Sequence, residues 1–202
     1  AHQLGTPISS LLGWLTILDQ HDVDEKILDQ IKRDIKRLET ISARFSKIGS
    51  LPNKKEVKLS AVADDLVSYM QIRMPKEVAL HIHKNGDEKQ VEVNSELIAW
   101  VLENLIKNSI DAIRGKGTIT IDMSWESTAI VTVQDTGSGM SKKLQKTIFN
   151  PGITTKKRGW GLGLSLAKRI VEQYHGGKLR LAESSEKGST FEIQLPLKQK
   201  YS

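Results

Sequence analysis

The spacing of apolar residues separates the first quarter of the chain from the rest. Within residues 1–48 apolar side chains recur every three or four positions, which is the spacing of one helix face. Two such runs flank residues 20–24, which are polar except for Val23, so the pattern predicts two helices joined by a turn. A hairpin of two helices cannot bury an apolar stripe by itself. We therefore expect residues 1–48 to form a homodimeric four-helix bundle; packing of the hairpin on the rest of the chain is the alternative.

Residues 51–55 contain Pro52 and polar neighbours, and they predict a linker between a domain at residues 1–50 and a second at residues 56–202. Helices are predicted in the second domain at residues 60–74, 95–114 and 162–174, and strands at residues 57–59, 78–83, 90–93, 118–125, 128–134, 178–182 and 190–195. Ser60, and either Asn94 or Ser95, are the predicted N-caps. The chain is thus predicted to be α+β, a helical hairpin followed by an α/β sandwich with helices on one face of a sheet.

The helix predicted over residues 95–114 has an unusual polar face. Asn104 and Asn108 lie one turn apart in its middle, where Asn is a poor helix former because its amide competes for backbone hydrogen bonds. Lys107 and two carboxylates, Glu103 and Asp111, fall on the same face. These groups can hold a hydrated divalent ion and a polyphosphate, although a solvated face explains them about equally well. The opposite face is apolar and predicts a core contact: Ile98, Val101, Leu102, Leu105, Ile106, Ile110 and Ile113.

Glycine-rich segments follow this helix. Asp135 comes directly after an apolar strand and can accept a hydrogen bond from an exocyclic amine, while Gly137 and Gly139 let the backbone pass close to a flat ring; a tight turn is the alternative. Residues 159–164 alternate glycine with larger residues and open a helix, where backbone N–H groups favour phosphate. Their late position excludes a dinucleotide fold, and no Gly-Lys-Ser/Thr follows them as a Walker loop requires. Thr190 offers a hydroxyl at a strand start, or is a plain hairpin residue.

Charge and composition narrow the partners. The net charge is +6, but the lysines and arginines are spread along the chain without a helix-turn-helix or RNA-binding motif, so nucleotide phosphates explain the charge and we expect no nucleic-acid partner. No apolar run approaches a membrane span, and the absence of cysteine fits a reducing compartment. We expect a cytoplasmic fragment of a longer protein, without direct membrane contact.

The order of the segments closely resembles the catalytic domain of sensor histidine kinases, members of the GHKL (Bergerat-fold) ATPase superfamily. The asparagine helix and residues 135–140, 149–151, 159–164 and 188–190 look like its N, G1, F, G2 and G3 boxes. The resemblance covers about residues 56–197 and implies ATP and Mg²⁺ as cofactors. It makes Asn108 the Mg²⁺ ligand, Asp135 the partner of the adenine amine and residues 140–158 an ATP lid, on which Lys156, Lys157 and Arg158 are cations for a γ-phosphate. The implied nucleotide-binding residues are Asn104, Lys107, Asn108, Asp111, Asp135, Gly137, Gly139, Gly159, Gly161, Leu162, Gly163 and Thr190.

Residues 1–8 resemble the H-box of the same family, in which a histidine attacks the γ-phosphorus of ATP. His2 takes that place, and a neutral imidazole is a suitable nucleophile near neutral pH. The family usually has Asp or Glu next, whereas this chain has Gln3, which cannot act as a useful base. Thr6 matches the position that helps to orient a water for dephosphorylating the response regulator.

The resemblance therefore implies a two-component signalling kinase. It would phosphorylate His2, pass the phosphoryl group to an aspartate of a response-regulator receiver domain, and act as a phosphatase as well. Its parent protein would be anchored in the inner or plasma membrane by family habit. The alternative that Gln3 raises is a kinase-weakened, phosphatase-biased or non-enzymatic signalling scaffold. Another GHKL enzyme, such as a protein serine kinase or a DNA-linked ATPase, is disfavoured by the H-box and the helical hairpin.

Overall fold

A computed structural model describes residues 11, 13–19, 25, 28, 29, 31, 32, 35, 53–156 and 161–197. The chain divides into two compact units, Ala1–Pro52 and Asn53–Ser202. In the first unit the described residues, apart from Asp19 in a turn, are helical. Leu15, Leu28 and Ile35 form a small buried cluster there, with Ile31 packed against it. The helical spacing predicted for these residues is therefore confirmed, whereas the four-helix bundle stays a prediction.

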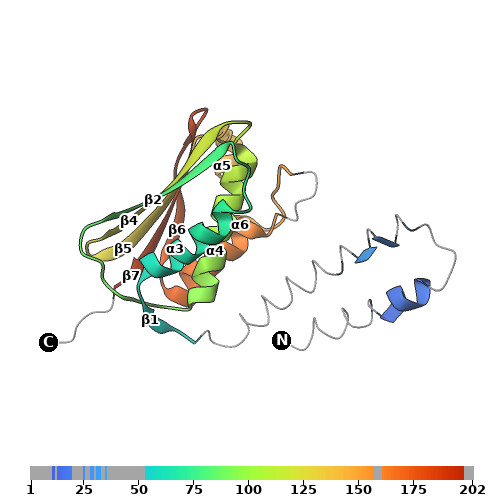
Figure 1. The fold of residues 1–202 in the computed structure, drawn as a ribbon, viewed down its shortest axis with the longest axis horizontal. Coiled ribbons are helices and arrows are strands. Elements are labelled where there is room, and N and C mark those ends of the chain that lie inside the picture. Colours follow the sequence, from blue (N-terminus) through green and yellow to red (C-terminus); the bar gives the residue numbers. More distant parts are fainter. Residues whose placement is uncertain are drawn as a thin grey trace. The chain divides into compact units, whose positions relative to one another are not determined.

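The second unit is built on a five-stranded sheet in the order β2-β4-β5-β7-β6. Only the β2–β4 pair is parallel. The helices α3, α4 and α6 cover one face of this sheet, which confirms the predicted α/β sandwich (Figure 1). A separate two-stranded sheet pairs β1 with β3. The strands are β1 (Lys55–Val57), β2 (Val78–Asn85), β3 (Val91–Val93), β4 (Gly117–Trp125), β5 (Thr128–Asp135), β6 (Lys178–Ser185) and β7 (Gly188–Pro196). The helices are α3 (Leu59–Gln71), α4 (Ser95–Ala112), α5 (Lys142–Gln145), α6 (Gly163–Arg169) and the π-helix η1 (Ile170–Tyr174).

The core lies between the helical layer and the sheet. Every second residue of β4 from Ile119 to Trp125 is buried, and the same alternation continues on β5 from Ala129 to Asp135. α4 supplies the facing layer with its buried residues Leu97, Ile98, Val101, Leu102, Leu105, Ile106 and Ser109. The predicted apolar face of this helix is confirmed except at Ile110, which is only half-buried. Ser109 is buried on this face instead, and its hydroxyl donates to the Asp135 carboxylate of β5.

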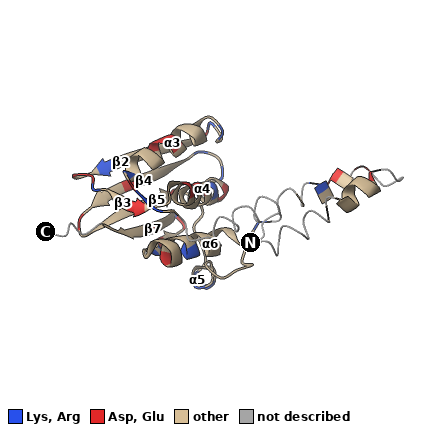
Figure 2. Ribbon diagram, turned by 90° about the horizontal axis from the view of Figure 1, so that it is seen from below, with Lys and Arg blue, Asp and Glu red and all other residues tan. Residues whose placement is uncertain are grey.

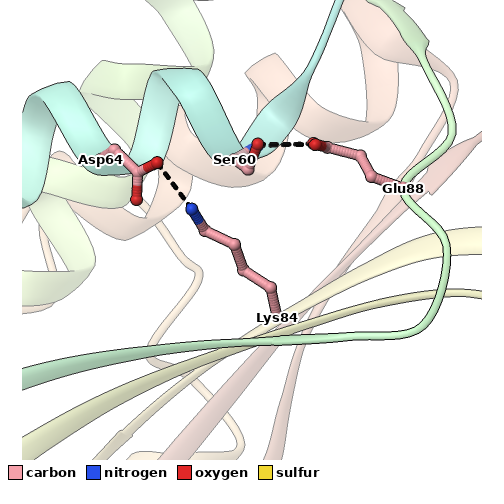
Figure 3. Close-up of polar contacts among 4 residues, drawn as sticks. All are labelled: Ser60, Asp64, Lys84 and Glu88. Carbon is pink, nitrogen blue, oxygen red and sulfur yellow. Dashed lines mark hydrogen bonds and ion pairs between the residues drawn. The ribbon is translucent and has the colours of Figure 1, made fainter.

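The start of α3 differs from the prediction. Ser60 is not the N-cap; the helix begins at Leu59, and the capping position is Lys58, whose side chain makes no cap hydrogen bond. Glu88, from the segment between β2 and β3, replaces a local cap: its carboxylate accepts from the Ser60 backbone N–H at 2.9 Å and from the Ser60 hydroxyl at 2.7 Å (Figure 3). A carboxylate near the N-terminus of a helix satisfies an N–H group that has no partner within the helix.

Several other boundaries shift by two or three residues: the strand predicted at residues 57–59 is β1 (Lys55–Val57), α3 ends at Gln71 instead of residue 74, and β6 extends to Ser185 instead of residue 182. Asn94 is the N-cap of α4, as expected, and its side chain accepts from the Leu97 N–H at 3.0 Å. The loop predicted at residues 136–160 contains the short helix α5, and the helix predicted at residues 162–174 changes from α6 to η1 at Ile170. Both α3 and α4 carry charged residues (Figure 2), and Asp65, Glu96, Lys107 and Asp111 among them are exposed. None of the helices in the described ranges has both the length and the apolar character needed to cross a bilayer.

Candidate nucleotide-binding site

Asp135 ends β5 at a position that faces the helical layer, and its side chain is buried. Its Oδ1 accepts from the backbone N–H of Gly137 at 2.8 Å and from that of Ser189 at 3.3 Å. Its Oδ2 accepts from the Ser109 hydroxyl of α4 at 3.1 Å. We call these four residues the carboxylate cluster. Three separate elements therefore fix one carboxylate, and a buried carboxylate needs such donors because burial without them is costly.

Backbone segments approach closely around this cluster. Gly188 has φ +129°, and a Cβ there would collide with the carbonyl oxygen of Asp135. Gly139 has φ +63°, and a Cβ there would collide with the carbonyl oxygen of Ser185. Residues with a side chain rarely adopt such φ values. The turn after β5 and the start of β7 thus require glycine for both conformation and space.

The turn after β5 also lies against the C-terminal end of α4. The Ser138 N–H donates to the Ala112 carbonyl at 3.1 Å. A Cβ on Gly137 would lie 2.7 Å from the Ala112 Cβ, which is shorter than real contacts allow. Gly137 therefore permits the end of α4 and the turn to meet beside Asp135.

Thr190, the predicted hydroxyl, lies one residue beyond the cluster. It pairs with Gln134 in the β5–β7 register, and its neighbour Ser189 pairs with Asp135. The Ser189 hydroxyl also lies 2.9 Å from that of Ser184, which accepts from the Met140 N–H at 2.9 Å. Sequence reasoning thus selected Thr190 and missed Ser189, Ser184 and Ser109. A serine on the apolar face of α4 was the available signal for Ser109, because that position predicts a hydrophobic residue.

The second part of the site is the polar face of α4. The Asn108 Oδ1 accepts from the Lys156 ammonium at 2.8 Å, and the same ammonium lies 2.5 Å from the Asp111 Oδ2. Lys107 pairs instead with Glu103, one turn away, at 2.5 Å. We call Asn104, Lys107, Asn108 and Asp111 the amide face. Lys107, Asn108 and Asp111 therefore lie on one face of α4. Lys156 is bound to two of them, Asn108 and Asp111.

Asn104 is covered by the start of α6. A Cβ on Gly163 would collide with the Asn104 Oδ1, so only glycine fits above this side chain. The Asn104 Nδ2 is buried and has no hydrogen-bond partner within the described part of the chain. A buried amide N–H without a partner is uncommon in folded proteins and marks a position where an acceptor is expected. The Nδ2 without a partner therefore lies where Asn104 meets Gly163, at the start of α6.

The described part of the glycine-rich segment, from Gly161 onward, is joined to the preceding loop. The Gly152 N–H donates to the Gly161 carbonyl at 3.0 Å, which joins the two ends of residues 152–161. Leu162 precedes α6 at its capping position. Gly159 and the lid cations Lys157 and Arg158 lie outside the described residues, as do the H-box positions His2, Gln3 and Thr6.

His175 has a structural position that the sequence did not reveal. Its ring is buried, its Nδ1 lies 2.8 Å from the Ile170 carbonyl, and its Nε2 accepts from the Asn94 N–H at 3.1 Å. The two contacts require a neutral ring with the proton on Nδ1. Burial lowers the pKa of His175 below its ordinary value, against the raising effect of the Ile170 hydrogen bond. The imidazole thus joins the end of η1 to the N-cap of α4.

Comparison with known proteins agrees with this geometry. Residues 93–199, more than half of the chain, match the family model described as histidine kinase-, DNA gyrase B- and HSP90-like ATPase. The chain belongs to this ATPase family. The matched residues include both the amide face and the carboxylate cluster.

Among curated proteins, the chain is 28% identical over 206 residues to the signal transduction histidine-protein kinase AtoS of Escherichia coli, covering 98% of this chain and 34% of AtoS. It is 31% identical over 211 residues to sporulation kinase C of Bacillus subtilis, covering 98% of this chain and 47% of that kinase. The chain therefore spans between a third and a half of the length of these relatives.

Solved structures give the same result. The catalytic domain of histidine kinase ThkA has a TM-score of 0.65 and 29% identity, covering 71% of this chain and 95% of that domain. The crystal structure of ThkA in complex with the response regulator protein TrrA matches with a TM-score of 0.69 and 26% identity, covering 100% of this chain and 61% of the matched chain.

Proposed function

We propose that this chain is the dimerising and ATP-binding core of a two-component sensor histidine kinase. The observation that carries the proposal is the Asp135 carboxylate. Its Oδ1 already accepts from two backbone N–H groups, whereas its Oδ2 accepts only from Ser109 among the described residues. A carboxylate oxygen has two acceptor sites, so the Oδ2 can accept one further hydrogen bond, as the exocyclic amine of adenine offers. The ATPase family and the histidine kinase relatives support this assignment.

The amide face suits the phosphate end of the nucleotide. Amide and carboxylate oxygens are ligands that Mg²⁺ accepts, and Asn108 and Asp111 provide both on one helix face. No group of three or more His, Cys, Asp or Glu residues in the described chain can hold a metal ion. Mg²⁺ keeps several waters and takes further ligands from substrate phosphates, so it needs few protein ligands. We assign Asn108 as the protein ligand, and the ion would neutralise charge on the transferred phosphoryl group.

His2 is the proposed nucleophile. Its neutral imidazole attacks the γ-phosphorus of ATP, the bond to the β,γ-bridging oxygen breaks, ADP leaves with that oxygen, and the ring releases its N–H proton to water. The phosphoryl group then passes to an aspartate of a receiver domain. A complex between the kinase ThkA and a response regulator supports such a partner. We further propose that residues 1–48 form the homodimer and that the core works in the cytoplasm, on a parent protein anchored in the membrane.

Gln3 raises a second candidate function on the same fold, although the histidine kinase relatives support the kinase. A glutamine beside His2 cannot take the imidazole proton, which would slow phosphorylation, whereas Thr6 supports dephosphorylation of the regulator. In that case the chain acts mainly as a phosphatase or as a scaffold that binds its partner.

The test is labelling with γ-labelled ATP and Mg²⁺, in the parent chain and in His2→Gln and Asp135→Asn variants. We expect an acid-labile, base-stable label that both variants lose, the first through its nucleophile and the second through nucleotide binding. His81→Gln, on an exposed strand position, is the matched control and should keep the label. Label retained in His2→Gln would contradict the assignment of His2. ATP binding without label would favour the phosphatase or scaffold function, to be tested with Thr6→Ala against a phosphorylated receiver domain.

A further inference from the structure

Lys156 connects two segments that are far apart in the sequence. Its ammonium contacts the Asn108 Oδ1 at 2.8 Å and the Asp111 Oδ2 at 2.5 Å, which joins the segment before the glycine motif to the middle of α4. The Lys156 backbone N–H donates to the Thr154 hydroxyl at 3.1 Å, so the start of the side chain is also held locally. One cation is therefore bound to the two oxygens that the amide face would offer to a metal ion.

We propose that Lys156 competes with the divalent ion for Asn108 and so sets how much Mg²⁺ the site requires. This inference rests on the proposed nucleotide site. A Mg²⁺ ion binds its oxygen ligands at about 2.0–2.1 Å. An ammonium group on the same amide oxygen would then lie within a few ångströms of a dication, and two positive charges at that separation repel strongly. Ion binding at Asn108 therefore requires the ammonium to leave.

The remaining contacts of the site agree with a competition confined to Lys156. Lys107, another cation on this face, is already paired with Glu103, and the hydrogen bond described to the Asn108 Oδ1 comes from Lys156. The Lys156 and Asp111 side chains are about half exposed, at 42% and 54%, so the pair can separate into water without disturbing the core. Exposed ion pairs of this kind are weak, so the competition should change the Mg²⁺ requirement modestly and not abolish binding.

The experiment measures ADP binding by calorimetry while Mg²⁺ is titrated at constant ionic strength. ADP is the probe because it lacks the γ-phosphate, which removes any direct contact between Lys156 and that group. In Lys156→Met we expect half-maximal ADP binding at a Mg²⁺ concentration about twofold to fivefold lower than in the parent chain, a range that corresponds to one exposed ion pair. Lys156→Arg keeps the charge and should retain the parent requirement.

Lys76→Met is the matched control. It removes the same charge from an exposed lysine between α3 and β2, outside the lid and both parts of the site, and Lys76 makes no ion pair with another described residue. Its Mg²⁺ requirement should equal that of the parent chain. An unchanged or higher requirement in Lys156→Met, with normal ADP binding in the parent, would overturn the competition. Absence of ADP binding in the folded parent chain at any Mg²⁺ concentration would instead overturn the proposed nucleotide site.

Discussion

The carboxylate cluster and the amide face meet at α4, which contributes Ser109 to the first and all four residues of the second, but different forces hold their side chains. Asp135 is buried and bonded to backbone N–H groups of two segments, which the register of β5 with β7 brings together. On the amide face, Lys107, Asn108 and Asp111 make contacts between flexible side chains, and Lys107 and Asp111 are exposed. The sheet therefore fixes the Asp135 carboxylate, whereas contacts between side chains hold Lys107, Asn108 and Asp111.

This difference suggests a division of work. A carboxylate that the fold has already oriented can select a base without rearrangement, because its donors cost no further ordering when the ligand binds. Charged groups at the surface exchange partners easily, since exposed ion pairs contribute little free energy. The amide face can thus pass from a lysine partner to an ion and phosphates while the carboxylate cluster stays unchanged.

The largest expected effect comes from Gly188→Ala, which disrupts the carboxylate cluster through the backbone. The new Cβ would meet the Asp135 carbonyl oxygen, and φ of +129° is unfavourable for alanine. We expect a loss of about 3 kcal/mol in the free energy of unfolding, from strain and overpacking together. Urea unfolding measures this loss, and ADP binding should fall with it.

Gly86→Ala is the control for strain without collision. Gly86 has φ +88°, and a Cβ there would meet no atom within 4 Å. Its expected cost is about 1 kcal/mol, from the backbone conformation alone. Equal costs in the two variants would show that close approach to Asp135 does not constrain the fold.

The sequence predicts the two parts of the site to different extents. Alternating and helical spacing gave the strands, α4 and its polar face, because burial imposes these periods on the chain. Ser189 and Glu88 could not be assigned in the same way. Their contacts depend on the pairing of β5 with β7 and on the path of the segment before β3, which no local pattern specifies. The nucleotide-binding residues as a set remain predictions, with Asp135 and Asn108 the best supported by geometry.

Acid is expected to have a smaller effect on the free energy of unfolding. It acts on His175, whose Nε2 accepts from the N-cap residue of α4, Asn94. The pKa of His175 is lowered in the folded chain, so the unfolded chain binds its proton more readily. Stability should therefore be complete above the ordinary pKa of histidine, about 6.5, and should fall as the pH decreases below it. Protonation of the Nε2 removes the bond from the Asn94 N–H, a loss on the order of 1 kcal/mol.

Urea unfolding between pH 8 and pH 5.5 measures this dependence. His175→Gln should lose it, whereas His83→Gln, at an exposed strand position, should keep it. The same slope in all three proteins would assign the effect to other groups.

The smallest effect on stability is expected from Lys107→Met, which tests whether the amide face is independent of the fold. Lys107 pairs with Glu103 one turn away, and its side chain is 58% exposed. Such pairs contribute about 0.3–0.5 kcal/mol, so urea unfolding should change by no more than that. ATP affinity should nevertheless fall a few-fold, because a cation beside the phosphates is lost.

Lys84→Met is the matched control: Lys84 pairs with Asp64 of α3 at 2.6 Å, outside both parts of the site (Figure 3). It should show the same small change in stability and the parent affinity for ATP. If Lys107→Met instead destabilises the fold as much as Gly188→Ala, the amide face contributes to the fold as strongly as the carboxylate cluster, and the distinction between the two parts fails.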